Sequence, residues 1–227
     1  MTAVHVEEGP DKGAIWHFGQ PAQEQRALAE GKAWADLSHL SIIAVTGDDR
    51  IKWLHDLTTQ HLLNIAAGDW LPAMILDHNG HVEYQFNLVD DGTTTFIVID
   101  PSYAEGLLAY LLKMRFMLKV DAADSSSEYA VLRAPGQPNE IGGPYALVPR
   151  GELDEMKKVF NENAKEVGTW SLDAVRVAAG RPRHGVDTDH KTIPNEIGVL
   201  NKDVHMNKGC YRGQETVAKV FNLGAPP

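Results

Sequence analysis

The chain lacks features that define several large classes of proteins. It contains one cysteine in 227 residues, so it forms no internal disulfide, and alone it cannot hold an iron–sulfur cluster, which needs about four cysteines. No stretch approaches the roughly 20 apolar residues that cross a bilayer. The first 20 residues carry Glu7, Glu8 and Asp11 and have no apolar run, which is unlike a signal peptide. We therefore expect a soluble, cytoplasmic protein.

Positive charge is also scarce. The sequence has 21 Lys and Arg against 31 Asp and Glu, a formal net charge of -10. A general nucleic-acid-binding surface needs a basic field, so this balance disfavours one. The content of 43% hydrophobic and 23% charged residues is that of an ordinary globular protein. The length fits one large domain or two modest ones.

The apolar periodicity predicts strands joined by turns, with helices between them. Asn79-Gly80 is a strong hairpin signal, and Ser171 is a candidate helix cap. Residues 180–227 read as irregular, and Gly224–Pro227 resembles a linker, as in a fragment or a short form of a longer protein. The order of three strands and then a helix is typical of the α+β class. Strands are expected over 36–45, 70–76, 82–89, 93–99, 128–133 and 145–148, and helices over 21–31, 51–57, 102–112, 152–167 and 172–179.

The single cysteine lies in an unusual segment. Its two glycines permit tight backbone and close approach of another molecule. The cations beside the cysteine would lower the pKa of its thiol and favour reactivity. The alternative is a thiol that simply packs, beside two solvated cations. The segment consists of Lys208, Gly209, Cys210, Tyr211, Arg212, Gly213, Gln214 and Glu215.

Residues near Cys210 could in principle support two other chemistries. Cysteine with histidine can bind zinc or form a nucleophile–base pair, and His184, His190 and His205 precede Cys210. Their spacing fits no common zinc pattern, so we expect no metal site. The segment also lacks the spacing and the ending of a phosphate-binding loop.

A local basic spot stands out in this acidic chain. Arg176, Arg181 and Arg183 fall within eight residues. They could hold a carboxylate-bearing ligand through forked hydrogen bonds. The alternative is that they balance charge at the surface.

Residues 208–215 resemble the signature of the YgfZ family. Members of this family are folate-binding relatives of the glycine cleavage T-protein, an aminomethyltransferase, and are linked to the maintenance of iron–sulfur enzymes. The resemblance runs from about residue 15 to the end of the chain. Other segments similar to these families are 35–38, 45–49, 53–59, 176–182 and 193–196.

The resemblance implies a T-protein-like folate-binding fold of the α+β class. Interleaved subdomains, each an antiparallel sheet with helices, would surround a central folate channel. Residues 1–50 with 170–227 would form a discontinuous first subdomain, and 51–169 an inserted ferredoxin-like subdomain. The C-terminal barrel that completes the ring in relatives would be absent from this chain.

The resemblance also implies a folate site with altered residues. Tyr84 and Gln85 stand where T-proteins carry two aspartates, and Glu83 is one residue out of register. Ala178 stands where T-proteins carry a glutamate that grips the pterin ring, and alanine accepts no hydrogen bond from it. Both losses argue against aminomethyl transfer. The cofactor-binding candidates are Tyr84, Gln85, Arg176, Arg181 and Arg183, the last two for a polyglutamate tail.

The expected function is therefore that of an accessory protein that binds tetrahydrofolate or a derivative. It would use Cys210 to support the assembly or repair of iron–sulfur enzymes. These clients include tRNA-thiomethylating enzymes, so any effect on tRNA modification would be indirect, with no direct nucleic-acid or membrane partner. One alternative is a tetrahydrofolate-dependent aminomethyltransferase that uses Glu83. Another is a structural interaction module with an inert cysteine.

Overall fold

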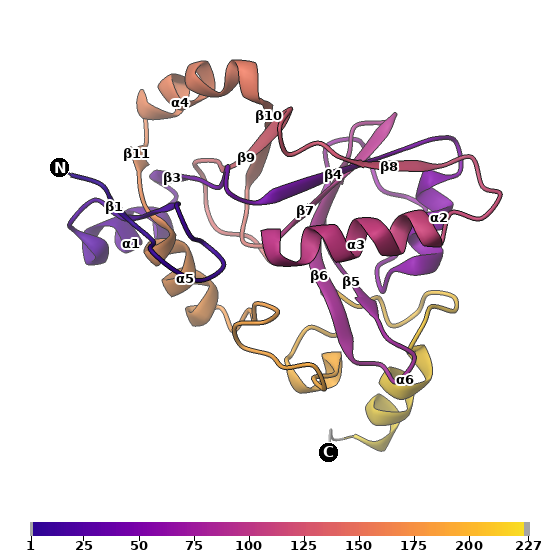
Figure 1. Cartoon of the computed structure of the whole chain (residues 1–227). Helices are drawn as coiled ribbons and strands as arrows, with labels where there is room; N and C mark the ends of the chain where they lie inside the picture. Colours follow the sequence, from indigo (N-terminus) through magenta and orange to yellow (C-terminus); the bar gives the residue numbers. More distant parts are fainter. Residues whose placement is uncertain (1, 225–227) are drawn as a thin grey trace. The chain divides into compact units, whose positions relative to one another are not determined.

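The computed structural model describes residues 2–224 (Figure 1). Residues 225–227 of the expected linker lie outside this range. The chain forms two compact units and passes between them several times. The first unit comprises residues 1–43, 100–104 and 124–179, and the second comprises 44–99, 105–123 and 180–227. In this division, residues from 180 onward group with 44–99.

The first unit is built on a four-stranded sheet. Its strand order is β10-β9-β3-β11, in which only the β3–β11 pair is parallel. Trp34 of β3 is fully buried and packs with Leu132 and Val148. The strands of this unit are β10 (Tyr145–Pro149), β9 (Tyr129–Arg133), β3 (Ala33–Asp36) and β11 (Lys165–Glu166), with a separate pair, β1 (Val4–His5) and β2 (Ile15–His17).

Three α-helices belong wholly to the first unit: α1 (Pro21–Ala29), α4 (Leu153–Asn161) and α5 (Thr169–Ala178). A short 3-10 turn, Arg150–Glu152, leads into α4. The prediction that Ser171 caps α5 is wrong. Gly168 precedes this helix and Ser171 lies inside it, fully buried.

The second unit is built on a five-stranded sheet of order β5-β6-β7-β4-β8. The predicted hairpin turn at Asn79-Gly80 joins β5 to β6, and the Asp77 carboxylate accepts the N–H groups of Asn79 and His81 at 2.8 Å. These bonds fix the turn that aligns the pair. The strands are β5 (Trp70–Leu76), β6 (Val82–Asp90), β7 (Thr94–Ile99), β4 (Ser41–Thr46) and β8 (Asp121–Asp124), with the first part of β4 and the last residue of β8 in the first unit.

Helices α2 (Arg50–Leu57) and α3 (Pro101–Lys113) agree with the apolar stripes in the sequence. From residue 105 onward α3 belongs to the second unit and runs across the sheet in Figure 1. Helix α6 (Gln214–Leu223) was not predicted, because the sequence of residues 180–227 reads as irregular. The short strands β1, β2 and β8 were also missed, and β11 falls in the predicted helix 152–167, which ends at Asn161. No helix between residues 2 and 224 is long and apolar enough to cross a membrane.

An apolar cluster holds residues 199–217 against the β5–β6 hairpin. The N–H of Val82 also donates to the Thr192 carbonyl at 2.9 Å. In Figure 1 the hairpin points toward α6. These contacts explain why residues 180–227 belong to the second unit. The buried members of the cluster are Met74, Leu76, Val82, Val199, Val204, Tyr211 and Val217.

Candidate functional site

Cys210 lies in the second unit and its side chain is exposed. Gly209 before it is also exposed, and a Cβ placed on Gly209 would meet nothing within 4 Å. The thiol is therefore presented to solvent with open space beside it. The alternative in which the cysteine packs in the interior does not hold.

Lys208, two residues earlier, is directed into the interior. It is 8% exposed, and its ammonium group donates to the backbone carbonyls of His55, Thr58 and Gln60, the last at 2.9 Å. Burial lowers the pKa of this lysine to about 8. The expectation that Lys208 activates the thiol thus requires correction, since its charge is bound to carbonyl oxygens. The alternative, a solvated lysine, is also wrong.

Arg212, on the other side of the cysteine, is similarly committed. Its Nε donates to the carbonyl of Leu76, and Nη2 forms an ion pair with Glu83. The guanidinium carbon lies 5.0 Å from the ring centroid of Tyr110. Arg212 therefore joins the segment to both strands of the hairpin and to α3, and its predicted role as an activating cation gives way to an anchoring one.

The remaining residues of the segment continue this anchoring. Tyr211 is 9% exposed within the apolar cluster, and burial raises its pKa to about 12. Gly213 has a φ of +81° and packs on the hairpin turn, where an added Cβ would lie 2.5 Å from the Asp77 carbonyl oxygen. Gln214 and Glu215 begin α6, with the Glu215 carboxylate in its first turn, where the helix dipole favours negative charge. Cys210 is thus an exposed residue between fixed neighbours.

Tyr84 and Gln85, both predicted to bind a cofactor, contact different segments. Successive side chains of a strand point to opposite faces of the sheet. Tyr84 faces α3, with its ring centroid 6.3 Å from that of Tyr110, and an added Cβ on Gly106 would lie 3.0 Å from its hydroxyl. Burial, followed by the charge of Glu83, raises the pKa of Tyr84. Gln85 faces residues 184–203.

Gln85 joins two residues that sequence reasoning did not connect with it. Its Nε2 donates to Oδ2 of Asp203 at 3.1 Å, and its Oε1 accepts the N–H of His184 at 2.9 Å. Asp203 is 1% exposed, and its Oδ1 has no hydrogen-bond partner among the described residues. Burial raises the pKa of Asp203. No local pattern marks this residue, because its partner Gln85 lies 118 positions away in sequence.

The three arginines of the basic spot fall in different surroundings. Arg176 belongs to the first unit, where its Nε donates to Oδ1 of Asp173 at 2.7 Å. Arg181 and Arg183 belong to the second unit. The charge of Arg181 opposes the effect of burial on the pKa of Asp203. Two of the predicted ligand residues thus influence Asp203: Gln85 through a hydrogen bond and Arg181 through its charge.

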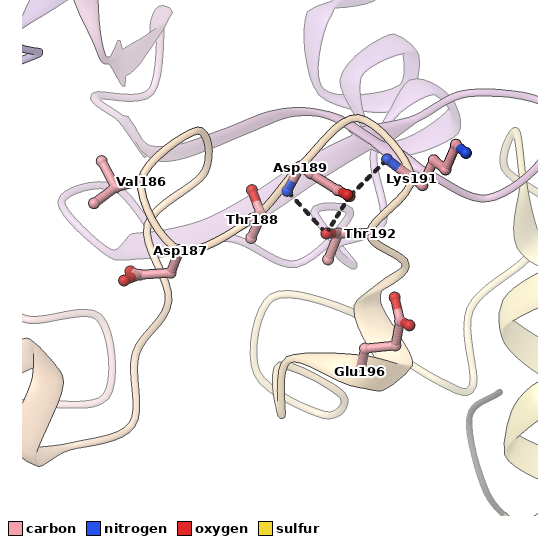
Figure 2. Close-up of a pocket in the computed structure, with 7 residues that line it drawn as sticks. All are labelled: Val186, Asp187, Thr188, Asp189, Lys191, Thr192 and Glu196. Atoms are coloured by element: carbon pink, nitrogen blue, oxygen red, sulfur yellow. Dashed lines mark hydrogen bonds between the residues drawn. The ribbon is translucent and has the colours of Figure 1, made fainter.

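A polar hollow lies along residues 186–196 (Figure 2). Its carboxylates are used within local turns: Asp189 accepts from the N–H of Lys191 at 2.9 Å and from the Thr192 hydroxyl at 3.0 Å. Glu196 accepts the N–H of Ile193 at 2.9 Å. The carboxylates of Asp189 and Glu196 therefore stabilise the loop that forms the hollow. Its lining residues are Val186, Asp187, Thr188, Asp189, Lys191, Thr192 and Glu196.

Within residues 2–224, no group of three or more His, Cys, Asp or Glu side chains is arranged to hold a metal ion. His205 stacks instead on His61, with ring centroids 5.2 Å apart. His184 bonds through Nδ1 to the hydroxyl of Thr188 at 3.0 Å.

A solved structure, that of the glycine cleavage system aminomethyltransferase T from Bartonella henselae, matches the fold with a TM-score of 0.80. The alignment covers 98% of this chain and 72% of that one, at 15% sequence identity. The chain has the aminomethyltransferase fold. The predicted T-protein-like α+β architecture is thereby confirmed.

Curated proteins match the chain at low identity. A chloroplastic protein of Arabidopsis thaliana, whose name proposes transferase activity, is 22% identical over 93% of the chain. The mitochondrial iron–sulfur cluster assembly factor IBA57 homologue of Mycosarcoma maydis is 22% identical over 91%. The chain spans 58% and 59% of the lengths of these two relatives. No protein-family model matches it.

Proposed function

We propose that this protein is a YgfZ-like cytoplasmic accessory protein that supports the assembly or repair of iron–sulfur enzymes through the thiol of Cys210. The observation that carries the proposal is the contrast in burial along residues 208–211. Lys208 and Tyr211 are buried, whereas Cys210 between them is exposed. A thiol held this way meets a large partner at a defined place and serves as a transient ligand or redox group. The name of the IBA57 relative, an iron–sulfur cluster assembly factor, agrees with this role.

The proposal includes a bound reduced folate, tetrahydrofolate or a derivative. Aminomethyltransferases with this fold use tetrahydrofolate, and the second unit supplies polar groups at Gln85, Arg181 and Arg183. A pterin presents donors as well as acceptors, so it could replace the His184 N–H and the Asp203 carboxylate that bond to the Gln85 amide in this structure. A polyglutamate tail is a chain of carboxylates, which suits arginine. The clients are iron–sulfur enzymes, so any effect on tRNA modification is indirect.

Aminomethyl transfer is the less favoured alternative. It would require a carboxylate free to assist at the folate nitrogen, and Glu83 was the candidate in the sequence. Glu83 is instead paired with Arg212 of the cysteine segment. A carboxylate that already accepts from a guanidinium is not free to take that role.

The thiol is tested by replacing Cys210 with alanine. We expect the Cys210→Ala variant to fail to complement a strain that lacks its own YgfZ protein, because no other residue of the chain carries a thiol. The readout is the activity of a tRNA-thiomethylating iron–sulfur enzyme in that strain.

The matched control is Gly209→Ala, which adds a methyl group in open space beside the cysteine. This control should complement, and both variants should unfold at the wild-type temperature. Full complementation by Cys210→Ala would remove the thiol from the mechanism.

The folate is tested by calorimetric titration with tetrahydrofolate and with its polyglutamylated form. We expect Arg181→Gln and Arg183→Gln each to weaken binding of the polyglutamylated form by about tenfold, the scale of one charge-assisted hydrogen bond. The effect on the monoglutamate should be smaller. Arg26→Gln, an exposed arginine of the first unit, is the control. Absence of binding to the wild-type protein would refute the folate part of the proposal and leave the thiol part standing.

A further inference from the structure

The turn that receives Lys208 is closed by a histidine. His55, in the last turn of α2, places its Nδ1 3.2 Å from the backbone nitrogen of Leu62. A backbone N–H can only donate, so Nδ1 is the acceptor and the imidazole is neutral with its hydrogen on Nε2. The carbonyls that bind Lys208 belong to the same turn, residues 55–60. His55 and Lys208 therefore hold one turn from two sides.

Protonation of His55 would disrupt this arrangement. A second ring hydrogen on Nδ1 would point at the N–H of Leu62, so that two hydrogen-bond donors would face each other. Both residues are buried, with His55 7% and Leu62 0% exposed. A buried N–H that loses its acceptor is destabilising. The new imidazolium would also repel the ammonium group of Lys208.

Other charged groups around His55 act in both directions. His61, whose ring centroid lies 4.9 Å away, and Lys52 of α2 oppose protonation, whereas Asp56 favours it. The C-terminal end of α2 also favours a positive charge. Burial is the largest influence and the charge of Lys208 the next, and together they lower the pKa of His55. His205, whose ring centroid lies 5.2 Å from that of His61, extends the cluster toward the residues that carry the cysteine.

We propose that residues 55–62 form an acid-sensitive clamp on the cysteine segment. A proton taken from solvent by His55 Nδ1 breaks the bond to Leu62, opens the turn and releases Lys208, so that residues 205–212 loosen. The segment that carries Cys210 would thus be fixed at neutral pH and mobile in acid. That this regulates the thiol rests on the proposed function, whereas the clamp itself is a property of the fold.

Hydrogen exchange of the whole chain, followed by mass spectrometry, tests the clamp. Protection factors, corrected for intrinsic exchange, are compared at about pH 7.5 and about pH 5.0, on either side of the ordinary histidine pKa. We expect peptides covering 55–62 and 205–212 to lose about tenfold in protection at the lower pH, as in local opening. Peptides covering 82–99 should keep theirs. Unchanged protection in the first two regions, or an equal loss over 82–99, would overturn the proposal.

The decisive variant is His55→Asn. The asparagine amide oxygen can accept the Leu62 N–H but does not titrate, so residues 205–212 should stay protected at about pH 5.0. His78→Asn, the same change at an exposed position of the hairpin turn, should respond as the wild type does. Loss of protection in His55→Asn equal to that of the wild type would refute the clamp.

If His55→Asn does not fold, the regional pattern in the wild-type protein decides alone. The measurement involves no folate and no iron–sulfur client. Failure of the clamp is therefore distinguishable from failure of the proposed function.

Discussion

Lys208 and Cys210 are two residues apart, and the fold buries one and exposes the other. A buried ammonium group is tolerated only where several oxygens surround it, and three backbone carbonyls do so here. In sequence a lysine beside a cysteine indicates thiol activation. The structure gives Lys208 a different task, which is to fix the backbone that carries the thiol.

Replacing Lys208 with methionine tests this anchoring task. Methionine keeps the length of the side chain but leaves three carbonyls without their donor. We expect the free energy of unfolding to fall by about 2 kcal/mol, the effect of buried acceptors left unsatisfied. Chemical denaturation measures it. Lys219→Met, an exposed lysine of α6, is the control and should change stability by less than about 0.5 kcal/mol. Equal effects in the two variants would contradict the anchoring role.

At the scale of elements, the start of α6 contacts the turn of the β5–β6 hairpin through Gly213. A Cβ on Gly213 would lie 2.5 Å from the Asp77 carbonyl oxygen and 2.9 Å from Cα of Gly80. Both of these are backbone atoms, which cannot move aside as a flexible side chain would. The left-handed φ of +81° adds strain for any residue with a Cβ. The approach of the helix to the turn therefore depends on this one glycine.

The two glycines that bracket Cys210 should differ sharply on replacement by alanine. Gly213→Ala should destabilise the protein by more than about 2 kcal/mol, from steric overlap together with backbone strain. Gly209→Ala should stay within about 0.5 kcal/mol, because its surroundings are open. Thermal and chemical unfolding of both variants measure the difference. A similar loss at both positions would mean that the segment is packed on each side of the cysteine.

Sequence alone predicted the elements whose apolar residues repeat regularly. Strand β5 and the hairpin turn are examples, since a short continuous apolar run and Asn79-Gly80 are local signals. Helix α6 was missed because only Val217 within it is fully buried, and its position depends on the glycine contact with the hairpin. The partnership of Gln85 with Asp203 joins residues 118 positions apart, which no local pattern reports. The exposure of Cys210 likewise follows from tertiary anchors at Lys208 and Tyr211.

At the scale of the whole molecule, Asp203 makes global stability depend on pH. Burial raises its folded pKa above the ordinary value of 3.8. In the window from about 3.8 up to that raised value, the folded protein keeps a proton that the unfolded chain has lost. The contribution of this group to the unfolding free energy therefore falls as pH rises through the window. Above it, the folded state keeps a buried carboxylate, one oxygen of which has no hydrogen-bond partner within residues 2–224.

Replacing Asp203 with asparagine removes this titration and keeps the size of the side chain and an oxygen for Gln85. We expect Asp203→Asn to be more stable than the wild type at about pH 7.5, because the folded state then no longer has to bury a charged carboxylate. The difference should shrink as the pH falls through that window and level off below about 3.8, where Asp203 is protonated in the folded and the unfolded state alike. Denaturant unfolding across this pH range measures it, with the exposed Asp69→Asn as a control that should show no such trend. A wild type more stable than Asp203→Asn at neutral pH would mean that the carboxylate is stabilised by a partner, as an ion pair with Arg181 would do.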